Sequence, residues 1–387
     1  MTKQQSLLKQ FNTAYAKDAE VVAYAPGRVN LIGDHTDYND GFVLPAAVNF
    51  GTHVLAAKRE DDVINVTAID IDNQRVSFNL SQIAFDDKNT WSNYVRGTII
   101  ELVKFIQSSQ PNTTIAGVDL LISGNVPQGA GLSSSAAFEI ALLKALSDLF
   151  DIPLPGIDAA KLGQKAENNF VGCQCGIMDQ LISALGKKSH AMLLDCRDLS
   201  YQFAKIPENM ALMIVNSNVK RELVSSEYNT RRAQCEAVAK HFNRSALRDV
   251  SLAELNEEKH NLAEELYKRA HHVISESERT LEALTALNTN NMARLSYLMA
   301  QSHRSLKDDF EVTTPELDYL VEILSRVVKE EGGVRMTGGG FGGCVVAILP
   351  KAIQTQAEQV VQEYYVKKTG IEPSIFICTA EHGAFSL

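Results

Sequence analysis

The chain has 387 residues, 45% of them hydrophobic and 22% charged, and this length predicts two domains with a cleft between them, because one hydrophobic core rarely grows beyond about 300 residues. The 37 basic and 47 acidic side chains give a net charge of -10, which disfavours nucleic acid and anionic membranes as partners. No stretch approaches the roughly 20 apolar residues of a membrane span, and the first residues lack an apolar signal core, so we expect a cytoplasmic protein.

The first half of the chain is predicted to be rich in strands. Alternation of apolar and polar residues predicts strands over residues 21–24, 41–48, 52–57, 63–68 and 118–122. Apolar residues at helical spacing predict helices over 91–107 and after a glycine turn at 128–131, where Ile140, Leu143, Leu146 and Phe150 repeat. Two more helices, 158–170 and 179–185, and two strands, 191–195 and 211–216, are predicted to follow.

The second half is predicted to be mainly helical. Helices are expected over 226–242, 262–287 and 291–306, followed by two strands around glycines within 333–349, a helix and a last strand at 374–378. We place a soft boundary near Ile206, which gives an N-terminal lobe of residues 1–206 and a C-terminal lobe of residues 207–387. For the last strand, a place in either lobe is compatible with the sequence, including a return to the N-terminal lobe. The pattern predicts an α+β fold in two lobes.

A glycine- and serine-rich segment, NVPQGAGLSSSAA at 125–137, follows a predicted strand and opens a predicted helix. Small residues let the backbone approach a phosphate closely, and a helix N-terminus supplies about half a positive charge, so an anion site here needs no lysine. The segment is not a Walker A loop, since no G-x-x-x-x-G-K-[ST] string occurs in the chain. A serine at this place can ligate Mg²⁺, whereas the alternative is an ordinary turn with Ser133 as helix cap.

A further glycine-rich segment, GGVRMTGGGFGGCVVAI at 332–348, contains a formal G-x-G-x-x-G match. A dinucleotide-binding turn must open a helix, but the residues that follow this match predict a strand. A protein-kinase loop is excluded as well, because Leu349 stands where the V-A-I-K lysine would be. We expect a β-turn that supports the phosphate loop, with a purely structural hairpin as the alternative.

The segment APGRVNLIGDHTDYNDG at 25–41 concentrates charged side chains behind a predicted strand. Arg28, Asp34, His35 and Asp37 lie within ten residues. Carboxylates are strong acceptors for hydroxyl donors, so this set suits a ligand with several hydroxyls, such as a sugar. A metal site formed by the D-H-x-D string and a merely polar turn both stay open as alternatives on spacing alone.

Two acidic residues and the cysteines complete the candidates. Glu167 lies on the predicted helix 158–170, and Asp179 starts the next helix, where it would by itself pass for a cap. The six cysteines are spread along the chain with one Cys-x-Cys pair and no Cys-x-x-Cys, which predicts reduced thiols without a metal.

Five segments, spread over nearly the whole chain, resemble the GHMP small-molecule kinases, and the first resembles the galactokinases in detail. GRVNLIGDHTDYNDG is similar to the galactokinase signature, and GNVPQGAGLSSSAA is similar to the family's ATP loop. GCQCGIMDQ is similar to the segment of the catalytic base, SSEYNTRRAQC to a sugar-side segment, and GGVRMTGGGFGG to the third glycine motif.

The resemblance implies an N-terminal lobe of the ribosomal-protein-S5-domain-2 type and a ferredoxin-like C-terminal lobe. Galactose and Mg·ATP would meet between the lobes. The implied reaction is phosphorylation of the anomeric C1 hydroxyl of α-D-galactose by ATP, giving galactose 1-phosphate and ADP, the first committed step of the Leloir pathway. The implied partners are these small molecules with Mg²⁺, and we expect a monomer.

The resemblance also assigns functional residues position by position. Asp179 matches the proton acceptor, and Arg28 matches the cation that stabilises the transition state. The sugar-binding positions are Asp34, His35, Thr36, Asp37, Gly176 and Tyr228. The phosphate loop is Gly129, Ala130, Gly131, Leu132, Ser133, Ser134 and Ser135, and the Mg²⁺ ligands are Ser135 and Glu167. Trp91, Asn93 and Tyr94 resemble the segment near the adenine.

One departure from the family pattern lies at Asp34, where the family usually has glutamate. The carboxylate starts one methylene farther from the sugar, so its contact requires a small backbone shift or a bridging water.

Three alternatives to a galactose kinase start from the same residues. An N-acetylgalactosamine or arabinose kinase would keep the phosphate machinery and change the sugar pocket. A catalytically silent relative that binds sugar and ATP can lose part of the Ser-Ala stretch, whereas Ser135, Ala136 and Ala137 are intact here. A mevalonate-type or homoserine-type kinase lacks the D-H-T-D-Y string that follows Gly33.

Overall fold

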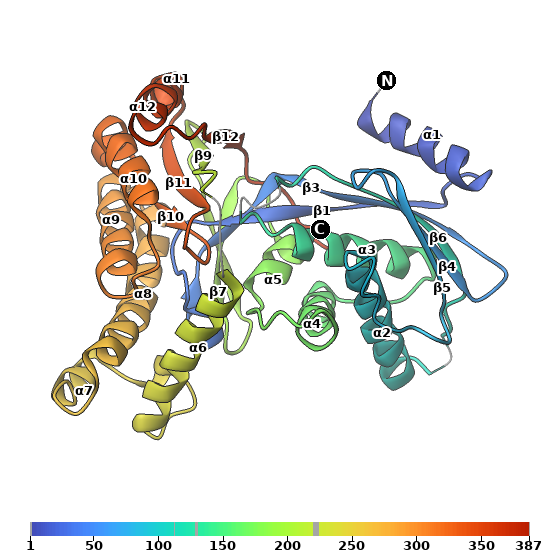
Figure 1. Cartoon of the computed structure of the whole chain (residues 1–387), viewed down its shortest axis with the longest axis horizontal. Helices are drawn as coiled ribbons and strands as arrows, with labels where there is room; N and C mark the ends of the chain where they lie inside the picture. Colours follow the sequence, from blue (N-terminus) through green and yellow to red (C-terminus); the bar gives the residue numbers. More distant parts are fainter. Residues whose placement is uncertain (1, 112, 128–130, 220–223, 387) are drawn as a thin grey trace.

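Two long antiparallel strands, β1 (Val21–Asn30) and β3 (Pro45–Lys58), run from the sheet of the N-terminal lobe toward the C-terminal lobe (Figure 1). The computed structural model describes residues 2–111, 113–127, 131–219 and 224–386. Gly129 and Ala130 of the predicted phosphate loop therefore lie outside the described residues.

The N-terminal lobe is built on a five-stranded sheet in the order β1-β3-β6-β4-β5, in which only β4 and β6 are parallel. Its other strands are β4 (Val63–Ala68), β5 (Gln74–Asn79) and β6 (Val118–Gly124). One face of the sheet carries α1 (Lys3–Tyr15), and the other carries α2 (Ser92–Ser109), α3 (Ser134–Leu149), α4 (Gly156–Ala166) and α5 (Met178–Leu185) (Figure 1).

Alternation along the central strands of this sheet explains why both faces are covered. Leu55 and Leu121 pack with Phe11 of α1, whereas Val54 and Leu120 belong to the larger core under the four helices. Successive side chains of a strand point to opposite faces, so a strand that is apolar at nearly every position must be buried on both sides.

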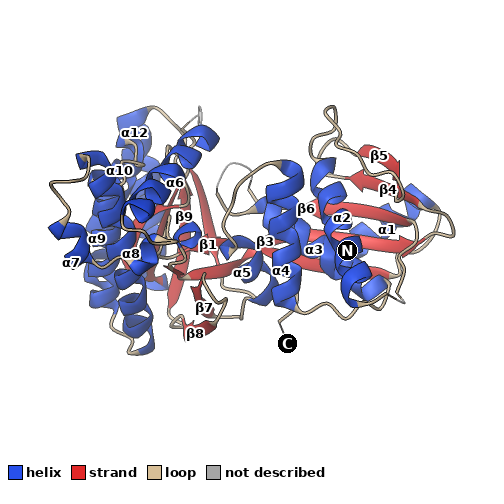
Figure 2. Cartoon of the chain, turned by 90° about the horizontal axis from the view of Figure 1, so that it is seen from below, coloured by secondary structure: helices blue, strands red, loops and turns tan. Residues whose placement is uncertain are grey.

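The C-terminal lobe is a four-stranded antiparallel sheet in the order β10-β11-β9-β12 with helices on its outer face (Figures 1 and 2). Its strands are β9 (Met210–Asn216), β10 (Gly333–Thr337), β11 (Cys344–Pro350) and β12 (Ser374–Cys378). Its helices are α6 (Val224–His241), α7 (Leu252–Glu257), α8 (Glu264–Asn288), α9 (Met292–Asp308), α10 (Pro315–Val328), α11 (Gln354–Val360) and α12 (Val366–Thr369).

The last strand, β12, pairs with β9 in this second sheet, and the residues after it cross back to the N-terminal lobe. Ala380 forms an isolated bridge with Val48. The backbone N–H of Phe385 then donates to the carbonyl oxygen of Ala184 in α5 at 2.8 Å. The chain thus returns to the first lobe after its last strand and not with it.

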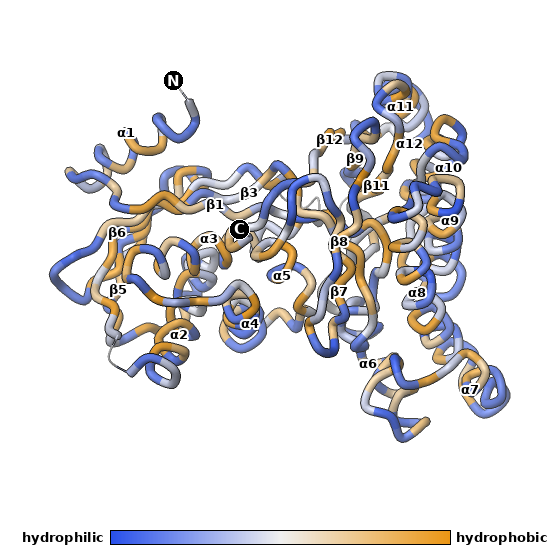
Figure 3. The backbone as a smooth tube through the Cα atoms, turned by 180° about the vertical axis from the view of Figure 1, so that it is seen from behind, coloured by the Kyte–Doolittle hydropathy of each residue, from blue (hydrophilic) through white to orange (hydrophobic). Residues whose placement is uncertain are grey.

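A shared core joins the two lobes. A small sheet of β2 (Phe42–Val43), β7 (His190–Asp195) and β8 (Tyr201–Lys205) lies beside it. Leu31 and Ile32, just after β1, belong to the same buried cluster as Ile214 of β9 and Val346 of β11. Hydrophobic residues follow the strands and the inner sides of the helices in Figure 3. The residues that follow β1 are therefore packed against the sheet of the C-terminal lobe.

Most predicted elements of regular periodicity are present. The strands at 63–68 and 374–378 have the predicted bounds, and the predicted strands at 41–48 and 52–57 form β2 and one long β3. The predicted helix 158–170 consists of α4 and a π-helical turn, Glu167–Val171. Within the described parts of the chain, no helix combines the length and apolar character needed to cross a membrane.

Candidate active site

Arg28 of β1 and Asp179, in the first turn of α5, form a two-point ion pair. Nε and Nη2 of Arg28 donate to Oδ1 and Oδ2 of Asp179 at 2.8 Å and 2.7 Å. Arg28 is only 8% exposed, and a bidentate pair of this kind fixes the orientation of both planar groups. The position of Asp179 at a helix N-terminus also suits its negative charge.

The described end of the glycine–serine loop reaches the same ion pair. Nη1 of Arg28 donates to the carbonyl oxygen of Gly131, and the hydroxyl of Ser133 donates to Oδ2 of Asp179. Gly27 permits this approach, because a Cβ there would lie 2.4 Å from the carbonyl oxygen of Leu132. Ser133 makes no capping bond to α3, so its hydroxyl serves Asp179 and not the helix.

A cavity of about 720 Å³ lies in front of this pair and collects residues from segments far apart in the chain. The predicted site residues that line it are Arg28, Asp34, His35, Asp37, Glu167, Gly176, Asp179 and Tyr228. Thr36 does not line it. Its buried hydroxyl lies 2.8 Å and 2.7 Å from the carbonyl oxygens of Gly33 and Phe42, so it closes the turn that presents its neighbours.

Asp37 and Gly176 face each other across the cavity wall. Burial, with the nearby charge of Asp179 as the second cause, raises the pKa of Asp37 to about 6. A Cβ built at Gly176 would lie 2.0 Å from Oδ2 of Asp37. The absence of a side chain at position 176 is therefore what lets this carboxylate occupy its place.

The Gly176→Ala variant is expected to raise the KM for the sugar at least tenfold, because the added methyl group must displace the carboxylate of Asp37. The KM for the nucleotide should stay within about twofold, since Gly176 does not line the second pocket described below. Steady-state kinetics with each substrate varied in turn measures both values. An unchanged sugar KM would show that the position of Asp37 is irrelevant to binding.

His35 is a neutral ring held by aromatic neighbours. Burial lowers the pKa of His35 to about 4, so at neutral pH it acts as a hydrogen-bonding group and not as a cation. Its Nδ1 lies 2.8 Å from the hydroxyl oxygen of Tyr38, and its ring packs against those of Tyr228 and Phe310. Nε2 is left without a well-formed hydrogen bond.

Asp34 lines the same cavity although its side chain is short. Nδ2 of Asn30 donates to its Oδ1 at 3.0 Å, and Arg335 of β10 donates to its Oδ2. The metal alternative for Asp34, His35 and Asp37 gains no support, because the described residues contain no group of three or more His, Cys, Asp or Glu side chains that could hold a metal ion.

Glu167 lies deeper in the cavity wall, where α4 passes into its π-helical turn. Burial and the charge of Asp179 raise the pKa of Glu167 to about 6, while hydrogen bonds from Ser135, Cys175 and Gln180 oppose this rise. Nε2 of Gln180 donates to Glu167 at 2.9 Å and to the fully buried Glu139 at 3.1 Å. Ser135 and Glu167, which are 32 positions apart in the chain, are thus neighbours in space.

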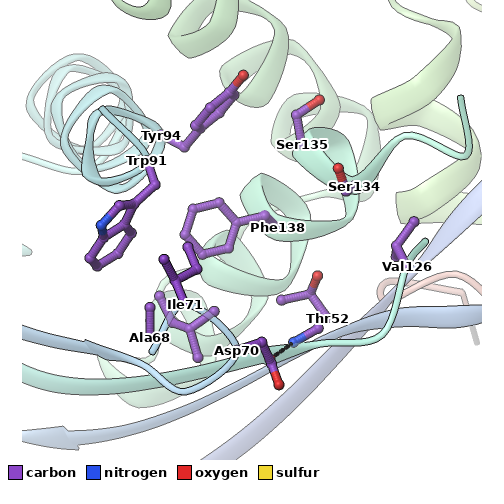
Figure 4. Close-up of a pocket in the computed structure, with 12 residues that line it drawn as sticks. Thr52, Ala68, Asp70, Ile71, Trp91, Tyr94, Val126, Ser134, Ser135 and Phe138 are labelled. Carbon is purple, nitrogen blue, oxygen red and sulfur yellow. Dashed lines mark hydrogen bonds between the residues drawn. The ribbon is translucent and has the colours of Figure 1, made fainter. Parts of the chain in front are cut away.

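A second pocket of about 310 Å³ opens on the other side of Ser135. Figure 4 shows Trp91 on one side of this pocket, Ser134 and Ser135 with their hydroxyls on the other, and Phe138 between them. Tyr94 also lines it. Asn93 does not, because its amide exchanges two hydrogen bonds with the backbone of Asp86 and so holds the preceding loop. The pocket offers apolar walls for a flat ring system and hydroxyls toward the cavity of Asp179.

The third glycine motif approaches the first segment instead of the described part of the phosphate loop. The N–H of Gly338 donates to Oδ1 of Asp34 at 3.3 Å, and Thr337 donates to the carbonyl oxygen of Asn30 at 2.8 Å. Gly338 and Gly339 line the cavity. Among the described contacts the motif supports the candidate sugar site, whereas its expected support of the phosphate loop stays a prediction because residues 128–130 lie outside the described residues.

Several site residues were not predicted: Asn30, Glu139, Gln180 and Arg335. A signal existed for Glu139, which lies four positions after Ser135 on one face of α3. Arg335 lies within the quoted third motif, but only the glycines of that motif were given a role.

The comparisons with known proteins agree with this geometry. Three family models match: the galactokinase galactose-binding signature at residues 9–58, the GHMP kinase N-terminal domain at 93–187 and the GHMP kinase C-terminal domain at 282–367. Fold and site thus define a GHMP kinase. The crystal structure of Lactococcus lactis galactokinase complexed with galactose is 34% identical, with all of both chains covered and a TM-score of 0.93. The chain therefore belongs to the galactokinase family.

Other kinases of known structure share the fold at lower identity. The Methanococcus jannaschii mevalonate kinase is 20% identical, with 94% of this chain and 98% of that chain covered and a TM-score of 0.64. A heptose 1-phosphate kinase from Bacteriodes thetaiotaomicron is 13% identical, with 94% and 97% covered and a TM-score of 0.61. These likenesses confirm the predicted two-lobed fold.

Proposed function

We propose that this protein phosphorylates galactose. It transfers the terminal phosphoryl group of ATP to the C1 hydroxyl of α-D-galactose and forms galactose 1-phosphate and ADP, the first committed step of the Leloir pathway. The observation that carries the proposal is that the galactose-binding signature, residues 9–58, contributes Arg28, Asp34, His35 and Asp37 to the cavity that Asp179 also lines.

Asp179 accepts the proton of the sugar hydroxyl. A hydroxyl is a weak nucleophile until its proton has an acceptor within hydrogen-bond reach. Three bonds from Arg28 and Ser133 hold the carboxylate of Asp179, whose side chain keeps 25% of its surface exposed toward the cavity. The base is therefore rigid and accessible.

Arg28 stabilises the transferring phosphoryl group. Its guanidinium lies between Asp179 and the carbonyl oxygen of Gly131, at the junction of the base and the phosphate loop. Negative charge spreads over the phosphoryl oxygens during transfer, and a fixed cation in a buried place stabilises that charge without having to reorganise.

The residues present fit a Mg²⁺ ion. Mg²⁺ in phosphoryl-transfer sites usually takes one or two protein oxygens together with phosphate oxygens and water. The carboxylate of Glu167 and the hydroxyl of Ser135 are such oxygens, and they lie between the two pockets. Bound Mg²⁺ would offset charge on the phosphate oxygens. Glu167 is buried near the carboxylate of Asp179, which destabilises its negative charge. A bound cation would stabilise that charge.

The nucleotide occupies the second pocket in this proposal. The adenine would lie between Trp91, Tyr94 and Phe138, and Ser134 and Ser135 would face the phosphates. The N-terminus of α3 supplies partial positive charge at the same place, which an acidic protein needs for binding a polyphosphate.

Acid is expected to weaken galactose binding through Asp37. With a pKa of about 6, Asp37 is a carboxylate at pH 7 and is largely protonated at pH 5. If the carboxylate form accepts a sugar hydroxyl, the KM for galactose rises about tenfold between pH 7 and pH 5. The charged and titratable groups that influence it are Asp34, Asp179, Arg28, Tyr38, Tyr228 and Arg232.

The Asp37→Asn variant is the control for this pH dependence. Its KM for galactose should be higher than that of the wild type at pH 7 but nearly constant between pH 7 and pH 5. If the variant keeps the wild-type pH profile, the titrating group is not Asp37.

Initial rates of ADP release on a panel of sugars test the proposed function. Galactose, N-acetylgalactosamine, arabinose and glucose are compared at equal ATP and Mg²⁺. The highest kcat/KM is expected with galactose. A preference for another sugar would overturn the substrate, and no ADP release with any of the four would overturn the activity.

Three coarser properties belong to the same proposal. The protein is a monomer, it acts in the cytoplasm, and its lobes divide near Ile206 into residues 1–206 and 207–387. Light scattering on the purified protein measures the first of these.

A further inference from the structure

Arg335 is a buried cation of the C-terminal lobe that contacts the sugar-side segment of the N-terminal lobe. It lies on β10 with 0% of its surface exposed. Its Nη2 donates to Oδ2 of Asp34, and its Nη1 donates to the carbonyl oxygen of Leu31 at 3.2 Å. One guanidinium thus holds both the side chain and the backbone of a segment that belongs to the other lobe.

Among the residues that the structure describes, three groups donate hydrogen bonds to the carboxylate of Asp34. Besides Arg335 on Oδ2, Oδ1 accepts from Nδ2 of Asn30 at 3.0 Å and from the N–H of Gly338 at 3.3 Å. A carboxylate offers about four acceptor positions. Asp34 is 3% exposed, and the surface it keeps faces the cavity. The remaining acceptor position is therefore available to a ligand hydroxyl.

We propose that Arg335 is a positioning residue for sugar recognition, which acts by fixing Asp34 so that its free acceptor position meets one hydroxyl of the sugar. This inference rests on the proposed function and extends it to a residue that touches neither substrate.

The chemistry of the pair requires arginine at position 335. The planar guanidinium bonds the carboxylate of Asp34 and the carbonyl of Leu31 at once, whereas a lysine ammonium would be a single point of attachment without this fixed geometry. A site that hydrogen-bonds a substrate hydroxyl rejects an analogue lacking that hydroxyl by a large factor. A loosened Asp34 should therefore cost selectivity and not only affinity.

The test compares the wild type with Arg335→Lys on galactose, on ATP and on the 2-, 3-, 4- and 6-deoxygalactoses. The KM for galactose should rise at least tenfold while the KM for ATP stays within about twofold. The selectivity ratio is kcat/KM for galactose divided by kcat/KM for a deoxy sugar. In the wild type this ratio should be large for each deoxy sugar that lacks a hydroxyl on which the site relies. In the variant it should fall about tenfold for one deoxy sugar, the one that lacks the hydroxyl bound by Asp34. Calorimetric titration with galactose alone should show the same loss of affinity.

Arg269→Lys is the matched control. Arg269 is 1% exposed, and its guanidinium bonds the carbonyl oxygen of Asp309 and the carboxylate of Glu311 within the C-terminal lobe. It should change the thermal midpoint but none of the selectivity ratios.

Should Arg335→Lys fail to fold, the variant Arg335→Gln keeps a planar donor for Asp34 or Leu31, leaves Asp34 unchanged and loses the charged two-point attachment. It should fold and show the same loss of discrimination against one deoxy sugar. The proposal is overturned if a folded Arg335 variant keeps the wild-type selectivity ratio for every deoxy sugar. It is also overturned if the selectivity ratios for all four deoxy sugars fall by the same factor, because that would indicate a general disturbance of the site. Failure of the proposed function would appear earlier, as absence of galactose turnover in the wild type.

Discussion

The Asp179→Asn variant should lose about 10³-fold in kcat and still bind galactose with nearly wild-type affinity. General-base catalysis contributes about 10² to 10⁴ in rate, and an asparagine keeps the size of the side chain but cannot accept the proton. The amide can still meet one donor of Arg28, so the local fold should persist. Coupled ADP-release assays give kcat, and calorimetric titration gives the galactose affinity.

The Asp158→Asn variant is a suitable control for this experiment. Asp158 also lies in the first turn of a helix of the N-terminal lobe, α4, but not in the candidate site. Its kcat should stay within about twofold of the wild type. If Asp179→Asn retained a tenth or more of the wild-type kcat, the base would have to be another group.

The Arg28→Lys variant should lose about 10²-fold in kcat with a much smaller change in either KM. Lysine keeps the positive charge but cannot bond Asp179 at two points and the carbonyl oxygen of Gly131 at the same time. Removing one fixed group that stabilises transition-state charge typically costs about 10² to 10³ in rate.

Arg59→Lys serves as the control for Arg28. Arg59 makes the same kind of two-point pair, with Asp61, but on the surface of the N-terminal lobe and outside both pockets. Loss of kcat in both variants, or in neither, would argue against a special role of Arg28. Calorimetry with the nucleotide separates a binding defect from a catalytic one.

Periodicity in the sequence predicted much of the fold because most strands and helices present one clear pattern. The strand at 63–68 and the helix that became α2 are examples. Of the elements that were not predicted, α1 and β5 have weak patterns, whereas α10 was missed although its buried residues Leu317, Leu320 and Leu324 repeat at helical spacing. In α1 only Leu7 and Phe11 are buried, and β5 alternates just two buried residues, Val76 and Phe78, with exposed ones. Elements with so few buried residues are stabilised by packing or pairing with the rest of the sheet, and the local sequence does not reveal those contacts.

The candidate site was predicted chiefly through motifs, and its remaining parts depend on contacts between distant segments. Arg28 and Asp179 are in contact across 151 positions, as the resemblance implied. Arg335 and Asp34 are separated by 301 positions, and no local pattern of charges indicates their pairing. Thr36 and Asn93 lie within recognised motifs, but their side chains bond the backbone of nearby loops and do not line the pockets. A position within a motif therefore does not reveal whether a side chain faces a ligand.

The return of the chain to α5 bears on the order in which this protein acquires its structure. A helix ends with carbonyl groups that lack partners within it, and in α5 the carbonyl oxygens of Ser183 and Ala184 accept from the N–H groups of Ala384 and Phe385. The helix that begins beside Asp179 is therefore completed by residues from the far end of the sequence. Contacts of such long range form late, since closing long loops is entropically costly. We expect the carboxylate of Asp179, the proposed base, to become rigid only in the last stage of folding, when both lobes are already assembled.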